Sequence, residues 1–166
     1  MIFGRPGSGK STFAFELAEQ LKIPLFHLDR YFYSHQWIER DYDEFLAIQK
    51  DLVTQDNWIV DGNATKSLEM RYARADIVIY FCLPRIICFW RVLKRRLFFK
   101  DCRIDDRAPE CYETIRWGLI KYMWTFEARV NDKIAYLQVK YPHAKFYIVH
   151  NTAERNKLMD KLIKSK

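Results

Sequence analysis

Apolar residues follow two different spacings along the chain, and the two spacings alternate. Short continuous apolar runs predict five β-strands, over residues 1–3, 24–28, 58–60, 77–81 and 146–149. Apolar residues three or four positions apart predict helices over residues 10–22, 41–55, 66–74, 84–98, 115–141 and 152–163. Strands that alternate with helices are typical of a parallel α/β sheet, and at this length we expect one domain over residues 1–166.

Several of these elements carry end signals. Pro24 marks the end of the first helix, and Pro84 occupies the favoured first position of the 84–98 helix. Asp41 is expected to cap the 41–55 helix, with Glu44 three residues later in a capping-box position. The run from Ile77 to Phe81 is entirely apolar, as expected for a central strand buried on both faces.

The composition is that of a folded globular chain. Hydrophobic residues make up 49% and aromatic residues 16%, with five glycines and five prolines, which excludes disordered and collagen-like classes. The longest uncharged apolar run has eight residues, far fewer than the roughly 18 of a membrane span. The first four residues are too short for a signal peptide, so we expect no membrane partner.

The chain is basic, and its positive charge is uneven. Lysine and arginine number 28 against 21 acidic residues, which gives a net charge of +7. Residues 85–107 alone contain eight basic and three acidic side chains. This balance suits an anionic partner such as a nucleotide, phosphate, nucleic acid or acidic membrane surface, although a basic run can also be a solvated face.

The cysteine pattern predicts no metal site. Cys82 lies in a strand-like apolar run and Cys88 in an amphipathic helix pattern, so we expect two inert core thiols. Cys102 and Cys111 are nine residues apart and form no CxxC pair, which argues against zinc. Free thiols fit a reducing, cytoplasmic location best.

A glycine-rich loop follows the first predicted strand. The run Gly4-Arg5-Pro6-Gly7-Ser8-Gly9-Lys10-Ser11 matches the phosphate-binding P-loop pattern G-x-x-x-x-G-K-[ST] at every fixed position. Glycines let backbone N–H groups turn toward phosphate oxygens, and the helix N-terminus adds positive potential. With Thr12, these residues predict ATP binding, in which Lys10 reaches the β- and γ-phosphates and Ser11 binds Mg²⁺.

A P-loop does not fix the reaction, because motors, GTPases, recombinases and small kinases share it. The chain contains no Asn-Lys-x-Asp guanine-binding motif, which argues against a G protein. Its 166 residues are too few for an AAA-type machine. A small phosphotransferase fits the length.

Further segments resemble adenylate kinases. Asp61-Gly62-Asn63 follows the third predicted strand, where those kinases carry a Walker B carboxylate, and it makes Asp61 a second Mg²⁺ candidate. The run Arg91 to Arg96 resembles the Arg-x-x-x-Arg that opens their lid. Arg103-Ile104-Asp105-Asp106, followed by Arg116, resembles the stretch that closes it.

Residues 2–149 also resemble a narrower group, the DNA topology modulation proteins. The matching residues are His27-Leu28-Asp29, Trp58 to Asn63, Arg71 with Ala75-Asp76, Pro84-Arg85 and Trp90 to Leu97. The resemblance implies a three-layer α/β/α P-loop fold with a five-stranded parallel sheet in the order 2-3-1-4-5, as in adenylate and shikimate kinases. It also implies an acceptor-binding insertion over about 30–56 and a lid over about 97–115. The name of the group implies an effect on DNA supercoiling.

Four arginines are candidates for the triphosphate. Arg91 and Arg95 are four positions apart on one predicted helix, so both guanidinium groups can face one phosphate chain. Arg103 and Arg107 are expected to close over ATP from the lid. Each could instead belong to a solvated basic face, and Arg116 could be purely structural.

The acceptor candidates lie at the carboxyl edge of the predicted sheet. Asp29 could take the acceptor's hydroxyl proton or hold Mg²⁺ through water, but it could also cap a helix or form a loop ion pair. Arg71 could bind an anionic acceptor or pair with Glu69 or Asp76. His27 fits a packed strand histidine better than a ligand.

Aromatic residues could contribute to the acceptor site. Five of them occur between positions 31 and 42, namely Tyr31, Phe32, Tyr33, Trp37 and Tyr42. They could stack on a base or ring of a nucleotide acceptor, or form a hydrophobic cluster under a flap. The aromatic residues of the 115–141 helix fit a core or interface better than a base-stacking surface.

Lys10, Asp29, Arg91 and Arg95 are thus the candidate catalytic residues of a kinase that uses ATP and Mg²⁺. The acceptor would be a small molecule or nucleotide. The alternatives are an ATP-gated nucleic-acid-binding protein with little kinase activity, and an ATPase switch that acts on a protein partner.

Overall fold

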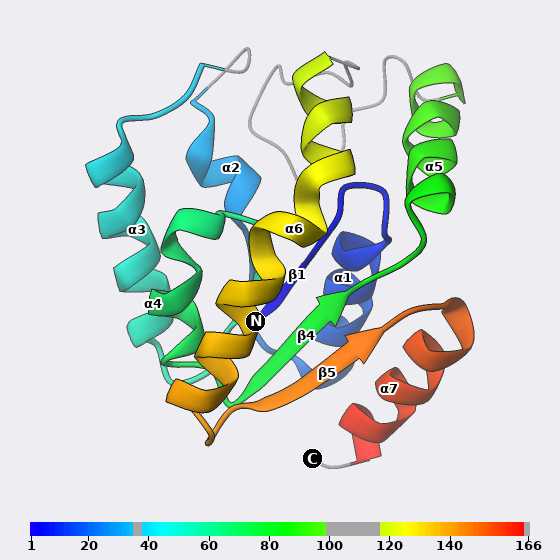
Figure 1. Ribbon diagram of the computed structural model, residues 1–166. Coiled ribbons are helices and arrows are strands. Elements are labelled where there is room, and N and C mark those ends of the chain that lie inside the picture. Colours follow the sequence, from blue (N-terminus) through cyan, green and yellow to red (C-terminus); the bar gives the residue numbers. More distant parts are fainter. Residues whose placement is uncertain (35–37, 99–116, 165–166) are drawn as a thin grey trace.

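A computed structural model describes residues 1–34, 38–98 and 117–164 (Figure 1). The strands are β1 (Ile2–Gly4), β2 (Leu25–His27), β3 (Ile59–Asp61), β4 (Ile77–Phe81) and β5 (Lys145–Val149). The helices are α1 (Lys10–Leu21), α2 (Leu28–Phe32), α3 (Tyr42–Thr54), α4 (Leu68–Tyr72), α5 (Arg85–Phe98), α6 (Trp117–Lys140) and α7 (Thr152–Lys164). A 3₁₀ turn, η1 (Thr65–Ser67), precedes α4.

The five strands form one all-parallel sheet in the order β2-β3-β1-β4-β5, which confirms the predicted fold class. β1 lies in the middle, with Ile2 opposite both Asp61 of β3 and Ile79 of β4. All five strands therefore end at the same edge, where β1 leads into the glycine-rich loop and β3 ends at Asp61.

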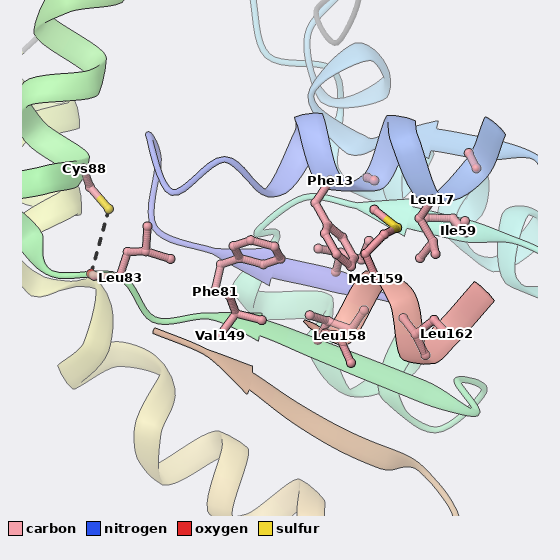
Figure 2. Close-up of a cluster of buried hydrophobic side chains, with 14 of the residues drawn as sticks. Phe13, Leu17, Ile59, Phe81, Leu83, Cys88, Val149, Leu158, Met159 and Leu162 are labelled. Atoms are coloured by element: carbon pink, nitrogen blue, oxygen red, sulfur yellow. Dashed lines mark hydrogen bonds between the residues drawn. The ribbon is translucent and has the colours of Figure 1, made fainter. Parts of the chain in front are cut away.

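Helices cover both faces of the sheet and make the predicted three layers. On one face, α1 and α7 pack against alternate strand residues, with Phe13 and Leu158 next to Phe81 in one buried cluster (Figure 2). On the other face, α4 and α6 cover β1 and β4, with Phe126 and Tyr72 among the buried residues. The apolar residues at spacing three and four on α6, from Met123 to Leu137, form its buried side.

The predicted helix cap is also present. The Asp41 carboxylate accepts hydrogen bonds from the backbone N–H groups of Asp43 and Glu44, at 3.0 and 3.2 Å. The Glu44 side chain pairs with Arg40 at 3.4 Å. The cap fixes the start of α3, which packs beside α2 through Phe45.

Two local predictions differ from the structure in detail. The strand expected over 24–28 is present as β2 but ends at His27, and the five-residue helix α2, which was not predicted, begins at Leu28, a buried residue near Gly62. The single helix expected over 66–74 is η1 followed by α4, which ends at Tyr72. Neither helix is long enough to carry a periodic pattern of its own.

Both described cysteines are at least partly buried. Cys88 of α5 is buried, and Cys82 is half-buried beyond the end of β4. Burial raises the pKa of each thiol. These findings agree with the prediction of inert thiols, and Cys102 and Cys111 lie outside the described residues.

Candidate active site

The glycine-rich loop joins β1 to α1 at the carboxyl edge of the sheet, beside α5 and α6 (Figure 1). Gly7 has a φ of 80°, in the left-handed region that side chains other than glycine rarely adopt. A Cβ atom there would lie 2.3 Å from the Cys88 carbonyl oxygen of α5. Only glycine therefore fits, and the loop packs tightly against α5.

The loop turns so that α1 begins directly under it. The Ser8 N–H donates to the Arg5 carbonyl at 3.1 Å, which closes the turn. Gly9 is the N-cap of α1, also left-handed at a φ of 89°, and as a glycine it has no side chain to bind the first amides of the helix. Those amides can therefore donate to an anion at this position.

Lys10, Ser11, His27 and Asp61 meet beneath the loop. Lys10 Nζ lies 3.5 Å from Asp61 Oδ1 and 3.2 Å from Ser11 Oγ. His27 Nδ1 lies 3.0 Å from Asp61 Oδ2. Burial alone would raise the pKa of Asp61, but the Lys10 ammonium and hydrogen bonds with His27 and Ser11 outweigh it and hold this pKa below its usual value.

Asp61 and Ser11 are chemically suited to Mg²⁺. Asp61 is 3% exposed, and its Oδ1 accepts no hydrogen bond from the described residues. An ionised carboxylate oxygen with a free lone pair, close to a hydroxyl group, offers the oxygen ligands that Mg²⁺ prefers. The predicted metal pair therefore fits the ion.

Arg91 reaches the loop from α5. Its Nη1 donates to the Ser8 carbonyl at 3.2 Å, and a Cβ built on Gly9 would lie 3.6 Å from the same nitrogen. Cys88 and Val92, on the buried side of the same turn, contact Gly7. Arg95 lies one turn further along α5 and is partly buried. Arg103, Arg107 and Arg116 lie outside the described residues.

Arg71 is not available to an acceptor in this structure, which corrects the prediction. The residue is 0% exposed, and its guanidinium donates to the carbonyls of Gly62, Asn63 and Ala64 at 3.0, 3.1 and 3.0 Å. Burial lowers the pKa of Arg71 to about 10, so the side chain stays charged at neutral pH. Its place is under the loop after β3, which it holds next to Asp61.

Glu69, one of the two ion-pair partners considered for Arg71 beside Asp76, is engaged elsewhere. Its carboxylate accepts from Lys140 at 2.7 Å and from the Tyr141 hydroxyl at 3.1 Å. The arginine therefore acts through backbone carbonyls instead of through the predicted ion pair.

Asp29 lies on the far side of the same edge, in the first turn of α2, and is exposed. The Asp29 charge acts on Tyr122 of α6, because burial and then the Asp29 carboxylate are the leading causes that raise the pKa of Tyr122. Tyr122 also bonds with the Asn63 side chain, and the Arg129 guanidinium lies 5.6 Å from its ring centroid. Asp29, Asn63, Tyr122 and Arg129 therefore form one group.

The sequence did not identify Asn63, Tyr122 and Arg129 as candidate site residues. The spacing of apolar residues placed Tyr122 on the long helix only as a core position, and Asn63 appeared only inside a matched motif. Arg129 carried no signal of its own. What brings them together is the crossing of α6 over the end of β3, a contact between segments about 60 residues apart.

The aromatic residues before α3 form a cluster among themselves. Phe32 packs against Tyr33 and Phe45, with ring centroids 4.8 and 5.0 Å apart. Tyr42 lies 6.5 Å from Phe45. This favours the hydrophobic-cluster alternative for these rings, while Tyr31 is half-buried and Trp37 lies outside the described residues.

No model of a known protein family matches the sequence, and no curated protein matches it at a significant level. Solved structures do match. A shikimate kinase from Acinetobacter baumannii, in complex with shikimate, is 14% identical with a TM-score of 0.57 over 99% of this chain and 90% of that one. A shikimate kinase from Bacteroides thetaiotaomicron is 16% identical, with a TM-score of 0.53 over 99% and 95%.

A third structure, an uncharacterized protein from Eubacterium ventriosum, is 16% identical, with a TM-score of 0.51 over 99% of this chain and 95% of that one. Together with the strand order, these matches define the class: the chain has the P-loop NTPase fold that shikimate kinases share. At these identities the likeness concerns the fold. In the described part of the chain, no helix combines the length and apolar character needed to cross a bilayer.

Proposed function

We propose that the protein is an ATP-dependent kinase that transfers the γ-phosphoryl group of Mg-ATP to a small-molecule or nucleotide acceptor. The observation that carries this proposal is the cluster beneath the glycine-rich loop, where Lys10 Nζ lies 3.5 Å from the buried Asp61 carboxylate and 3.2 Å from the Ser11 hydroxyl. A cation, a hydroxyl and a carboxylate at the N-terminus of a helix are the groups that a triphosphate with Mg²⁺ requires.

Each residue has a definite task in this proposal. The loop amides and Lys10 bind the β- and γ-phosphates, and Arg91 adds a positive charge from α5. Ser11 and Asp61 would hold Mg²⁺, which supplies charge neutralisation on the phosphates when bound. Arg95 and Arg103 are proposed to bind the same phosphate chain.

Asp29 is proposed as the group that accepts the hydroxyl proton of the acceptor. It lies in the first turn of α2, directly after β2, and it is exposed. A carboxylate can take a proton from a hydroxyl group that the site holds within hydrogen-bond distance. Asn63, Tyr122 and Arg129 are proposed to contact the acceptor beside it.

Two observations support the class of acceptor. The shikimate kinase from Acinetobacter baumannii was solved with shikimate, which supports a small hydroxylated acceptor. Arg129 above Tyr122 suits an acceptor that carries a negative charge. The intracellular location expected for an ATP-consuming enzyme is part of the proposal.

The test is a screen of nucleosides, nucleotides and small hydroxylated metabolites for ADP formation that depends on the acceptor. Lys10→Ala should abolish this ADP formation and keep the fold, as checked by circular dichroism. Equal phosphotransfer by Lys10→Ala and the parent would contradict the proposal. ADP formation that no acceptor stimulates would instead indicate an ATPase switch.

A nucleic-acid-binding protein is the second candidate, and one observation favours it. Helix α5 contains five basic and no acidic residues, and its Trp90 side chain is 63% exposed. Cations beside an exposed aromatic ring are typical of surfaces that bind single strands. Tight DNA affinity that falls steeply with salt would support this candidate, whereas weak affinity together with acceptor-dependent turnover would exclude it as the main function.

A further inference from the structure

Arg5 occupies a variable position of the glycine-rich loop, and yet its side chain is 1% exposed. Its side chain reaches α6 and the residue segment that follows β4. A charged side chain is rarely buried to this degree unless its donors are satisfied. The partners of Arg5 therefore indicate what it does.

All three groups of donors on the Arg5 guanidinium are used. Nε donates to the Met123 carbonyl at 2.7 Å, Nη1 to the Leu83 carbonyl at 2.9 Å, and Nη2 to Glu127 Oε1 at 2.6 Å. Met123 and Glu127 belong to α6, and Leu83 follows β4. One side chain thus connects the loop to two elements that are 78 to 122 residues away in the sequence.

Glu127 is held in place from a second side. Its Oε2 accepts from Arg85 of α5 at 3.1 Å, while Oε1 accepts from Arg5. Burial would raise the pKa of Glu127, but the hydrogen bonds from Arg5 and Arg85 lower it further than burial raises it. The carboxylate therefore stays ionised at neutral pH and balances the buried charge of Arg5.

The backbone of Arg5 is part of the loop that would bind phosphate. Its carbonyl accepts from the Ser8 N–H at 3.1 Å, so the position of Arg5 determines the position of the turn over Pro6 and Gly7. The preceding residue is held as well, because the Gly4 N–H donates to Asn63 Oδ1 at 3.0 Å. Phosphate-binding amides are effective only when they are fixed before the ligand arrives.

The same turn of α6 also faces the other side of the site. Tyr122 precedes Met123, and it bonds with Asn63 and is acted on by the Asp29 charge. Met123 and Glu127 accept from Arg5. A single turn and a half of α6 therefore contacts both the proposed acceptor group and the loop proposed for ATP.

We propose that Arg5 is a positioning residue, which fixes the glycine-rich loop to α6 so that the loop amides are held ready for the triphosphate. The proposal rests on the proposed function, since it assigns Arg5 a task in ATP binding. Lysine cannot replace Arg5, because one ammonium group does not present the planar set of donors that meets two carbonyls and a carboxylate at once.

The experiment compares Arg5→Lys with the parent protein by calorimetric titration with MgATP and by hydrogen exchange of the free protein. We expect MgATP affinity to fall at least tenfold in Arg5→Lys. The amides of residues 7–9 should exchange at least tenfold faster, while those of β4 keep their protection. Arg85→Met is the matched control, because it removes the exposed partner of Glu127 and leaves the three bonds of Arg5, and its affinity should stay within twofold.

A purely structural role of Arg5 would lower the melting temperature and leave the affinity of the folded variant unchanged, and this result would overturn the inference. Glu127→Gln is the second variant if Arg5→Lys does not fold, with an expected three- to tenfold loss of affinity. In the double variant that combines Arg5→Lys with Glu127→Gln, the loss of MgATP affinity should be smaller than the product of the two single losses, because both changes act through one contact.

The two proposals fail in different ways. If the parent protein does not bind MgATP, the proposed function is wrong. The exchange rates of residues 7–9 in the free protein still decide whether Arg5 fixes the loop. If the parent binds MgATP and Arg5→Lys matches it in affinity and exchange, only the role of Arg5 is wrong.

Discussion

The two halves of the site edge are built in different ways. On the proposed nucleotide side, residues 4–11 form one continuous segment from the end of β1 to the first turn of α1, and the loop within it is fixed by Arg5, by Arg91 and by the fit of Gly7 against α5. On the proposed acceptor side, Asp29, Asn63 and Tyr122 come from three separate segments, and Asp29 is exposed. A rigid loop suits a ligand with an unchanging triphosphate, whereas an edge assembled from separate segments can vary with its acceptor.

Lys10→Ala tests the nucleotide side most severely. Loss of the cation proposed for the β- and γ-phosphates should lower acceptor-dependent ADP formation by roughly 100- to 1000-fold, because it removes a charge that stabilises the transferring group. Coupled-enzyme assays measure the rate. Lys50→Ala, an exposed lysine on α3, is the control and should keep the parent rate. If the rate of ADP formation by Lys10→Ala stays within threefold of the parent rate, Lys10 is not part of the catalytic site.

Gly7→Ala should break the fit between the loop and α5. The left-handed φ of 80° and the 2.3 Å approach of a new Cβ to the Cys88 carbonyl should lower the free energy of unfolding by about 3 kcal/mol. Urea denaturation measures the change. Gly118→Ala on α6 is the matched control, because a Cβ there meets no atom of the described residues within 4 Å. We expect it to be neutral or stabilising by up to about 1 kcal/mol.

The attachment of the loop to α6 should depend on pH through Glu127. The pKa of this carboxyl is lowered in the folded protein, so its stabilisation is complete above the unfolded pKa of about 4.3 and is lost as the pH falls through the folded value. Glu127→Gln should cost about 2 kcal/mol at pH 7. Urea denaturation at pH 7, 5 and 3.5 measures the free energy of unfolding of both proteins. The difference between Glu127→Gln and the parent should shrink only at the lowest pH.

A difference that stays constant down to pH 3.5 would show that the charge of Glu127 contributes nothing to this attachment. Arg85→Met at the same pH values removes the exposed Arg85–Glu127 pair and keeps the buried Arg5–Glu127 pair. It therefore separates the contributions of the two pairs to the free energy of unfolding.

Tyr122→Phe should give the smallest effect, and only on the acceptor side. Removal of the hydroxyl that bonds with Asn63 should raise the KM of the acceptor found by the screen by about 3- to 10-fold. The MgATP affinity should not change. Tyr136→Phe, an exposed tyrosine on the same helix, is the control and should alter neither constant. A parallel loss of MgATP affinity in Tyr122→Phe would mean that the two halves are not separate.

The fold class was predictable because its signals are local or came with the family resemblance. The alternation of strands and helices predicts a parallel sheet, the resemblance to adenylate and shikimate kinases implies its strand order, and residues 4–11 form one contiguous pattern. The capping of α3 by Asp41 depends on atoms within three residues, and it was predicted for the same reason. These features need no knowledge of the tertiary structure.

The rest depends on contacts between distant segments. Arg5 stands at a position that the P-loop pattern leaves open, and its partner Glu127 is 122 residues away, so the pattern could not assign it a role. Arg71 suited an acceptor by its type and position, but its burial beneath the 62–64 carbonyls is a property of the folded chain. The helix α2 is too short to show a period, so its sequence resembled the end of a strand.

The low thiol reactivity expected of Cys82 and Cys88 has a practical use. Since one thiol is enclosed and the other half-enclosed, and burial raises the pKa of both, maleimide dyes should react with neither at neutral pH. Once Cys102 and Cys111 are replaced by serine, a single new cysteine on the exposed side of α2 could carry a fluorophore. The emission of such a label would follow ligand arrival at the acceptor edge in real time, without an enzymatic assay.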